Sequence, residues 1–234
     1  MKIGIFGING LSAGKANIVD PRVDALQKMF NAGKKVYIQA EIITAVEKLQ
    51  EVDGIICPEN SKLDIIVNDI EFVETRLERA TEAVEKSLFA RFKEQLDKEQ
   101  FLNEVALSED EKKLISGYSL LTIKPVYLAK AEEIEDKDKL LFSAYYSFGY
   151  ISFFTAGDKD SHAWPVKKGD NAWEASGAIH SDIQKGFIRA EVTGYNDLIA
   201  DGSLSRARSN NHIRLEMKEY IVQDGDYMVF RCNK

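Results

Sequence analysis

Residues 9–16 contain a glycine-lysine pair that could bind phosphate. The segment reads Asn9-Gly10-Leu11-Ser12-Ala13-Gly14-Lys15-Ala16. In a phosphate-binding loop, Gly-x4-Gly-Lys-Ser/Thr directly precedes a helix. Its backbone N–H groups surround the phosphates, the lysine reaches the outer phosphates and the hydroxyl holds Mg²⁺. Gly14 and Lys15 fit this pattern, and Gly10 completes the candidate site, but Asn9 stands at the first glycine position and Ala16 replaces the hydroxyl. We interpret the segment as a surface loop of small residues, in preference to a vestigial phosphate-binding site.

Other groups that nucleotide hydrolysis or metal chemistry would need are missing from the sequence. Hydrolysis needs an Asp-x-x-Gly element that holds the metal and positions water. The corresponding segment, after an apolar run at 35–40, reads Glu41-Ile42-Ile43-Thr44-Ala45. No His-x-x-x-His or Cys-x-x-Cys spacing occurs among His162, His180, His212 and the two cysteines. We therefore expect neither a metal site nor a cofactor.

Four basic residues near the C-terminus are candidates for contact with RNA phosphate or an acidic partner. They flank Ser209-Asn210-Asn211-His212 and are Arg206, Arg208, Arg214 and Lys218. Clustered lysine and arginine side chains are typical of surfaces that bind phosphate by charge. A flexible, solvated loop is an equally good interpretation of this segment.

The composition is that of an ordinary globular chain, and it excludes some functions. The 234 residues are 44% apolar and 29% charged, with a formal net charge of −7. This acidic balance argues against a protein that holds bare nucleic acid by phosphate contacts over its whole surface. The sequence contains no long apolar run and no signal-peptide pattern. We therefore expect a cytoplasmic protein without a membrane span.

The first 149 residues predict an α/β domain with a helical arm. Short apolar runs predict strands at 2–6, 35–40, 53–57, 123–129 and 140–146. Asp20-Pro21 predicts the start of a helix that ends near Gly33, and residues 43–49 predict a short helix. Residues 63–103 contain neither Gly nor Pro, and predict one long helix or a helical hairpin bent near 81–87. Apolar residues spaced alternately by four and three form a coiled-coil seam there: Ile66, Ile70, Val73, Leu77, Ala80 and Val84.

Residues 150–234 predict a small β-grasp module. An extended run at 153–157 and a second at 164–166 precede a short helix at Asn171, which Asp170 can cap. Another extended segment follows at 187–192. Asp224-Gly225-Asp226, between apolar runs at 220–222 and 228–230, predicts a hairpin turn.

Several multi-residue motifs resemble one family. The stretches IHSD at 179–182, GFIRAEV at 186–192 and YIVQDGD at 220–226 resemble the C-terminal TGS domain of the YchF (Obg-like) ATPase/GTPase family. VDPRVDAL at 19–26 resembles the family's Asp-Pro-Arg-Leu-Asp-x-Leu segment. VETRLER at 73–79 resembles the start of its coiled-coil arm, and LLTIKPV at 120–126 the strand before its base-recognition motif. The landmarks keep the family's order at shorter spacings.

The resemblance implies a fold and a class of partner. The expected fold is a reduced, degenerate P-loop-NTPase-like parallel sheet in residues 1–149, with an inserted helical arm at about 63–117. A β-grasp (ubiquitin-like) TGS domain is expected at 150–234. The resemblance also implies the ribosome, RNA or a protein as partner, with any small ligand of the TGS domain left unknown.

The base-recognition position departs from the family pattern. The family has Asn at the end of the Lys-Pro strand, whereas this chain has Lys130, which cannot offer a carbonyl and amide pair to a purine edge. Three departures together predict that the chain is not an enzyme. It would then be a non-catalytic YchF-like regulatory factor that binds RNA, the ribosome or a protein. The alternative is a residual ATP- or GTP-binding protein or slow hydrolase that uses Gly14-Lys15.

Overall fold

The computed structural model describes residues 1–233, which form two compact units. The first unit contains Met1–Ala16 and Ala40–Leu140, and the second contains Asn17–Gln39 and Leu141–Lys234. The division therefore differs from the predicted boundary at 149/150, because residues 17–39 belong with the C-terminal part of the chain. Within the described residues, no helix is long and apolar enough to cross a lipid bilayer.

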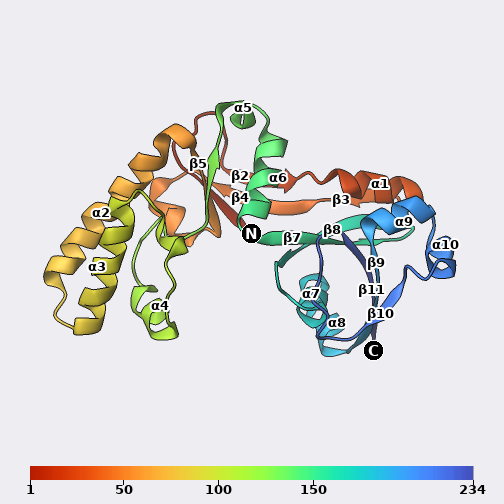
Figure 1. Cartoon of the computed structure of the whole chain (residues 1–234). Helices are drawn as coiled ribbons and strands as arrows, with labels where there is room; N and C mark the ends of the chain where they lie inside the picture. The colour runs from red at the N-terminus through yellow and green to blue at the C-terminus, as the bar shows by residue number, and fades with distance from the viewer. Residues whose placement is uncertain (234) are drawn as a thin grey trace. The chain divides into compact units, whose positions relative to one another are not determined.

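A five-stranded sheet lies at the centre of the first unit, in the order β2-β4-β1-β5-β6 (Figure 1). Its strands are β1 (Lys2–Ile5), β2 (Gly14–Ile18), β4 (Ile38–Ile43), β5 (Gly54–Pro58) and β6 (Val126–Ala129). Strand β1 pairs in parallel with β4 and β5, and β5 pairs in parallel with β6. The predicted α/β fold is confirmed.

Close packing under β1 explains why a glycine interrupts its apolar run. A Cβ atom at Gly4 would lie 2.7 Å from Cδ2 of Leu49, so only glycine lets this side chain reach the strand. Leu49 is fully buried and belongs to the 3-10 helix η1 (Val46–Glu51). Residues 43–49 thus finish β4 and begin η1, so the short helix predicted there is a 3-10 helix that starts three residues later, at Val46.

The helical arm is a hairpin of α2 (Lys62–Arg79) and α3 (Ala83–Asp97), which lie side by side in Figure 1. The chain turns at Ala80, whose backbone is extended. Val84 lies beyond that turn and is 63% exposed, so the predicted seam does not continue through it. Of the two alternatives, the hairpin is confirmed over the single long helix.

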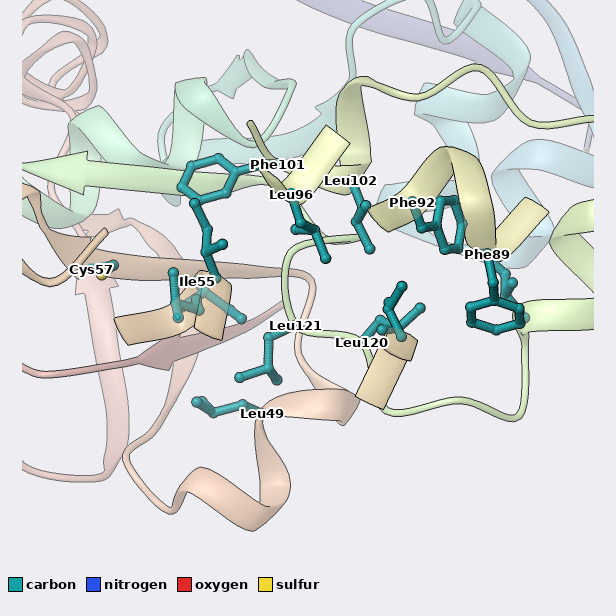
Figure 2. Packing of buried hydrophobic residues seen from close by; sticks show 14 of the residues in the cluster. Leu49, Ile55, Cys57, Phe89, Phe92, Leu96, Phe101, Leu102, Leu120 and Leu121 are labelled. Atoms are coloured by element: carbon teal, nitrogen blue, oxygen red, sulfur yellow. The ribbon is translucent and has the colours of Figure 1, made fainter. Parts of the chain in front are cut away.

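One apolar cluster joins the helical hairpin to the sheet of the first unit (Figure 2). Phe89, Phe92 and Leu96 face inward from α3, at spacings of three and four residues. They pack in the same cluster as Ile55 of β5 and as residues of the loops around η3 (Leu102–Glu104) and α4 (Glu109–Ile115). Burial of this shared core, more than helix propensity, holds the hairpin in place.

A six-stranded sheet forms the second unit, in the order β10-β9-β11-β7-β8-β3. Its strands are β3 (Lys34–Val36), β7 (Tyr150–Ala156), β8 (Asp160–Lys167), β9 (Phe187–Gly194), β10 (Arg214–Glu216) and β11 (Asp226–Cys232). Its helices are α1 (Pro21–Phe30), α7 (Ala172–Ile179), α8 (Ser181–Lys185), α9 (Tyr195–Asp201) and α10 (Leu204–Ser209). The cap of α7 is Asn171, which forms a capping box with Glu174, rather than the predicted Asp170.

Residues 34–43 form two strands of different sheets, so the single strand predicted at 35–40 is wrong. Strand β3 pairs in parallel with β8 at the edge of the second sheet, and after Tyr37 the chain enters β4 of the first sheet. Helix α1 lies against the second sheet: Phe30 stacks on Tyr227, and the Ser161 hydroxyl donates to the backbone oxygen of Val23. These contacts explain why residues 17–39 belong to the second unit.

Residues 140–146 lie within a helix, α6 (Lys137–Ser147), and not in the predicted fifth strand. Leu140, Leu141, Ala144 and Tyr145 are fully buried. Their spacing of three and four residues is that of one helical face. The apolar run was too short for its period to be decisive in the sequence.

The Asp224-Gly225-Asp226 segment is a turn, but it does not connect a hairpin. Residues 220–222 contribute only an isolated bridge, between Ile221 and Asn171. Strand β11 pairs instead with β9, antiparallel, and with β7, in parallel. The predicted hairpin is wrong because the strand that pairs with β11 lies about thirty residues earlier in the chain.

Candidate functional site

A cavity opens at the carboxyl ends of three parallel strands of the first unit. It has a volume of about 390 Å³ and is lined by residues that end or follow β1, β5 and β6: Gly7, Ile8, Asn9, Pro58, Glu59, Asn60, Ala129, Ala131 and Ile134. After β1 the chain runs to strands on the β4 side, and after β5 it runs to β6 on the other side. Ligands of open α/β sheets bind at such a switch point. We call this site the switch-point cavity.

The start of α2 brings backbone donors to the edge of the switch-point cavity. The N–H of Lys62 donates to Glu59 within the 3-10 turn η2 (Glu59–Ser61), but the N-cap side chain of Ser61 makes no capping hydrogen bond. No side chain at the N-cap therefore occupies the next N–H groups of this 18-residue helix. Gly7 adopts a φ of 70°, and a Cβ atom there would lie 3.2 Å from Oγ of Ser61. A glycine thus lets the loop after β1 lie against the helix start, which carries the positive end of the helix dipole.

The predicted base-recognition position lies at the cavity. Lys130 is the exposed N-cap residue of α5 (Ala131–Ile134), and both of its neighbours line the cavity. Its backbone N–H donates to Oε2 of Glu133 over 3.0 Å, and the Tyr127 hydroxyl donates to Oε1 over 2.7 Å. These two hydrogen bonds lower the pKa of the Glu133 carboxyl. Glu133 therefore holds α5 to the end of β6.

The candidate phosphate-binding residues Gly10, Gly14 and Lys15 lie elsewhere. Gly14 and Lys15 are exposed and begin strand β2, so no helix follows them directly. Gly10 has a φ of 92°, and a Cβ atom added there would meet no heavy atom of the described residues within 4 Å. None of the three lines the switch-point cavity. The lysine cannot combine with a helix N-terminus as it does in a phosphate-binding loop, because the segment is extended.

Two motifs that carried the family resemblance meet in the second unit. Arg22 of the Asp-Pro-Arg segment donates to Asp20 from Nε over 3.0 Å and from Nη2 over 2.7 Å, and from Nη1 to Asp224 of the Asp-Gly-Asp turn over 2.7 Å. Asp224 also accepts from the Tyr146 hydroxyl and from the backbone N–H of Ser152. Burial opposes ionisation of Asp224, but these hydrogen bonds outweigh it and lower its pKa. The network ties α1 to the sheet.

The four basic candidates do not form one cluster. Arg206 and Arg208 lie on α10, and Arg208 pairs with Glu191 over 3.2 Å. Arg214 lies on β10 and donates to Glu216 and to the Tyr220 hydroxyl, both over 3.1 Å. Lys218 lies 3.8 Å from Glu219. The predicted long loop is therefore replaced by a helix and a strand, which separate these side chains.

Two further arginines join Arg208, and neither was among the predicted binding residues. Arg231 of β11 donates to Oε1 of Glu191 from Nε over 3.1 Å and from Nη2 over 2.6 Å. Arg189 of β9 stands directly opposite Arg231 in the strand register. The signal that could have found them is the alternation of apolar and charged residues in GFIRAEV and MVFRC, which puts the charged residues on one sheet face.

No group of three or more His, Cys, Asp or Glu side chains within residues 1–233 is arranged to hold a metal ion. Glu59 contributes an acidic side chain to the lining of the switch-point cavity. Cys57 is buried at the end of β5, and burial raises the pKa of its thiol to about 12. The thiol is therefore mostly protonated near neutral pH, which makes it a poor nucleophile.

Comparison with known proteins places the chain among named relatives. Residues 150–233 match the family model YchF-GTPase_C, described as a protein of unknown function (DUF933). The chain is 30% identical to the ribosome-binding ATPase YchF of Bacillus subtilis (strain 168) over 251 positions, which cover 80% of this chain and 68% of that protein. It is 41% identical to Obg-like ATPase 1 of Danio rerio over 95 residues, which cover 41% of this chain and 24% of that protein.

A solved structure shows the same fold. The Schizosaccharomyces pombe YchF GTPase superposes with a TM-score of 0.76 at 18% identity, over 99% of this chain and 97% of that one. These relatives are named ATPases or GTPases, a finding that contradicts the prediction that the chain is not an enzyme. Three departures in short motifs are weaker grounds than similarity along most of a relative's length. On that similarity, the chain belongs to the YchF (Obg-like) ATPase family.

Proposed function

We propose that this protein binds a nucleotide in the switch-point cavity and associates with the ribosome. The observation that carries the nucleotide site is the position of the cavity, where the carboxyl ends of β1, β5 and β6 meet the first turn of α2, which no N-cap side chain occupies. Phosphate groups bind at such helix starts, because N–H donors and the helix dipole both favour negative charge there. Ribosome association is supported by the name of the Bacillus subtilis relative.

Different residues of the cavity lining would suit different parts of a nucleotide. The backbone N–H groups at the start of α2 and the side-chain amides of Asn9 and Asn60 would hold phosphate or ribose oxygens. Pro58 and Ile134 offer apolar surface to a base. Glu59 would meet a Mg²⁺ ion carried by the phosphates, and such an ion would neutralise charge that develops during phosphoryl transfer.

The base end of the site would recognise its ligand differently from the family pattern. Lys130 stands where the family has Asn, and its ammonium group can donate but cannot accept a hydrogen bond. The N6 amino group of adenine needs an acceptor, whereas O6 of guanine needs a donor. Comparing ATP with GTP therefore tests what Lys130 contributes.

We also propose a domain type for each of the two units. The first unit would be a shortened nucleotide-binding domain, because the alignment with the Bacillus subtilis relative runs over 251 positions although this chain has only 234 residues. The relative must therefore carry residues that face gaps in this chain. The second unit would be a β-grasp TGS domain that has acquired β3 and α1. Its support is the order β7, β8, α7, β9, β11 and the YchF-GTPase_C match over residues 150–233.

Equilibrium binding of fluorescent ATP, ADP and GTP analogues with Mg²⁺ tests the nucleotide site. We expect Gly7→Val to abolish binding, because a branched side chain at a φ of 70° would disturb the contact with Ser61. Lys15→Ala is the matched control and should bind normally. Loss of binding in Lys15→Ala alone would favour the Gly14-Lys15 site instead. Release of phosphate from ATP and GTP, measured on the same proteins, reports hydrolysis.

Co-sedimentation with ribosomes, with and without nucleotide, tests the second part of the proposal. The wild-type protein should sediment with ribosomes at physiological salt. Its absence from the ribosome pellet under every nucleotide condition would refute ribosome association and leave the nucleotide site to be judged by binding alone.

A further inference from the structure

Another cavity of the first unit lies at the amino end of β6, beside α4. It has a volume of about 400 Å³, and its lining comes from η1, from α4 and from the segments on either side of α4: Gln50, Leu107, Lys112, Ile115, Ser116, Tyr118, Leu120, Ile123 and Lys124. The switch-point cavity lies at the carboxyl end of β6 and shares none of these residues. We call this second site the α4 cavity. Its volume is in the range of cavities that bind small molecules.

Apolar side chains form a large part of the lining of the α4 cavity. Ile115 and Leu120 are buried members of the cluster that joins the helical hairpin to the sheet, and Leu120 is labelled in Figure 2. Leu107 and Ile123 are half-buried and pack against the same cluster. An apolar chain placed in the cavity would cover this surface and remove it from water.

The polar side chains of the α4 cavity are mainly donors. Among the described residues that line it, none is acidic. Lys112 and Lys124 contribute ammonium groups, which can donate hydrogen bonds but cannot accept them. Oε1 of Gln50 accepts from the Ser119 hydroxyl, so the NH₂ group of Gln50 is left to donate. The polar part of the lining therefore suits an acceptor that carries negative charge.

Lys124 lacks a counterion within the protein. Its side chain is half-buried, and within residues 1–233 its ammonium group makes no hydrogen bond or ion pair. Burial lowers the pKa of Lys124, and the charge of Asp53 opposes this effect only in part. The ammonium group is therefore partly withdrawn from water. Lys112, by contrast, is 57% exposed and pairs with Glu109 over 2.7 Å.

We propose that the α4 cavity binds a small carboxylate with an apolar chain, of the chemical class of a medium-chain fatty acid. The carboxylate would accept from the ammonium group of Lys124 and from the NH₂ group of Gln50. The chain would lie against Leu107, Ile115 and Ile123. Charge complementarity favours a monoanion, because one ammonium group of the cavity lacks a neutralising charge. The inference goes beyond the proposed nucleotide and ribosome binding and depends on neither.

Isothermal titration calorimetry of the full-length protein with decanoate tests the role of Lys124. The variant Lys124→Met keeps an unbranched side chain and removes the charge. It should bind decanoate at least about tenfold more weakly than wild type, because a hydrogen bond to a charged group contributes about that factor or more. Decan-1-ol has no charge to pair with Lys124, so it should bind both proteins alike.

Lys113→Met is the matched control. Lys113 is 78% exposed, pairs with Asp110 and does not line the α4 cavity, so this variant should bind decanoate within about twofold of wild type. Melting temperature checks that the variants fold. Lys124→Met should melt no lower than wild type, because burial disfavours the charged form of Lys124.

Isoleucine methyl signals in nuclear magnetic resonance spectra locate the bound decanoate. Ile115 and Ile123 line the α4 cavity, whereas Ile134 lines the switch-point cavity. Decanoate should shift the methyl signals of Ile115 and Ile123 and leave that of Ile134 unchanged. The spectra are recorded without nucleotide, so the result does not depend on the proposed nucleotide site.

The inference is overturned if wild type does not bind decanoate, or if Lys124→Met binds it within about twofold of wild type. Equal affinity of wild type for decanoate and decan-1-ol would show that the carboxylate is not recognised. A shift of the Ile134 signal without shifts at Ile115 and Ile123 would place the ligand in the wrong cavity. Tighter binding of a short apolar peptide with a free C-terminal carboxylate would assign the cavity to a protein C-terminus instead.

Discussion

Replacing Arg22 by Met should strongly destabilise the second unit. Arg22 is the cation between two carboxylates, and its own side chain is 18% exposed. The side chain of Asp20 is only 1% exposed, so after the substitution its carboxylate would remain buried with the backbone N–H of residue 22 but without a cation. Removing one partner of a buried ion pair costs about 3–5 kcal/mol. Asp224 is 36% exposed and can rehydrate, so we expect the lower end of that range, about 3 kcal/mol.

Tryptophan fluorescence during urea unfolding reports the stability of the second unit, in which Arg22 lies. The two tryptophans of the chain, Trp164 and Trp173, both lie in the second unit. For a denaturant slope of about 2 kcal/mol per molar urea, a loss of about 3 kcal/mol shifts the midpoint by about 1.5 M. The matched control is Arg208→Met, which breaks an exposed ion pair and should cost at most about 1 kcal/mol.

A second substitution tests whether the buried charge of Asp20 causes the loss of stability in Arg22→Met. Asn at position 20 keeps the capping oxygen of α1 and removes the buried negative charge. The double variant Arg22→Met/Asp20→Asn should therefore recover more than half of the stability that Arg22→Met loses. The reasoning is refuted if Arg22→Met costs less than about 1 kcal/mol, or if Asn at position 20 restores nothing.

Two further predictions concern one buried carboxylate in each unit. Asp69 is fully buried on α2 and accepts from the backbone N–H of Leu121 and from the N–H and hydroxyl of Thr122, so Asp69→Ala should cost about 3 kcal/mol by leaving these donors unpaired. When the Asp69→Ala variant is unfolded with urea, the circular dichroism signal at 222 nm should change at a lower urea concentration than tryptophan fluorescence. A simultaneous change of both signals would contradict the prediction. The hydrogen bond to Asp201 raises the pKa of His212, so its stabilisation is complete below about pH 6.5 and disappears as pH rises through the folded-state pKa. The melting temperatures of wild type and His212→Gln should therefore converge above the folded-state pKa of His212. A difference in melting temperature that stays constant from pH 5 to 8 would refute the coupling.

The sequence predicted elements whose signals are local. The strands β7, β8 and β9 were identified from their extended apolar runs, and the start of α7 was identified to within one residue, although its cap is Asn171 and not the predicted Asp170. Strand β3 was missed because its partner β8 lies about 125 residues later in the chain, and no local pattern records such a pairing. Helix α6 was missed because its buried residues form a run too short to distinguish a period of two from 3.6.

The candidate site was harder to predict because its lining residues come from three segments that lie far apart in the sequence. Most residues that line the switch-point cavity have no catalytic side chain, and parallel pairing of β1, β5 and β6 brings them together. One signal was present in the sequence, since the apolar runs of these strands end near Gly7, Pro58 and Ala129. The ends of parallel strands meet at one edge of a sheet. The Gly14-Lys15 site was predicted from a short motif, whereas the position of the cavity depends on the order of the strands in the sheet.

The Asp-Pro-Arg segment shows how a motif can mark structure rather than chemistry. Its place early in the chain associates it with the first unit, yet Arg22, which pairs with Asp20, donates to Asp224 and Tyr146 in the second unit. The chain must therefore leave the first sheet after β2, complete α1 and β3 on the second sheet, and return as β4. Residues 150–234 alone lack the cation that Asp224 binds and the strand that pairs with β8. The second unit is thus completed by a segment that the sequence places more than one hundred residues away.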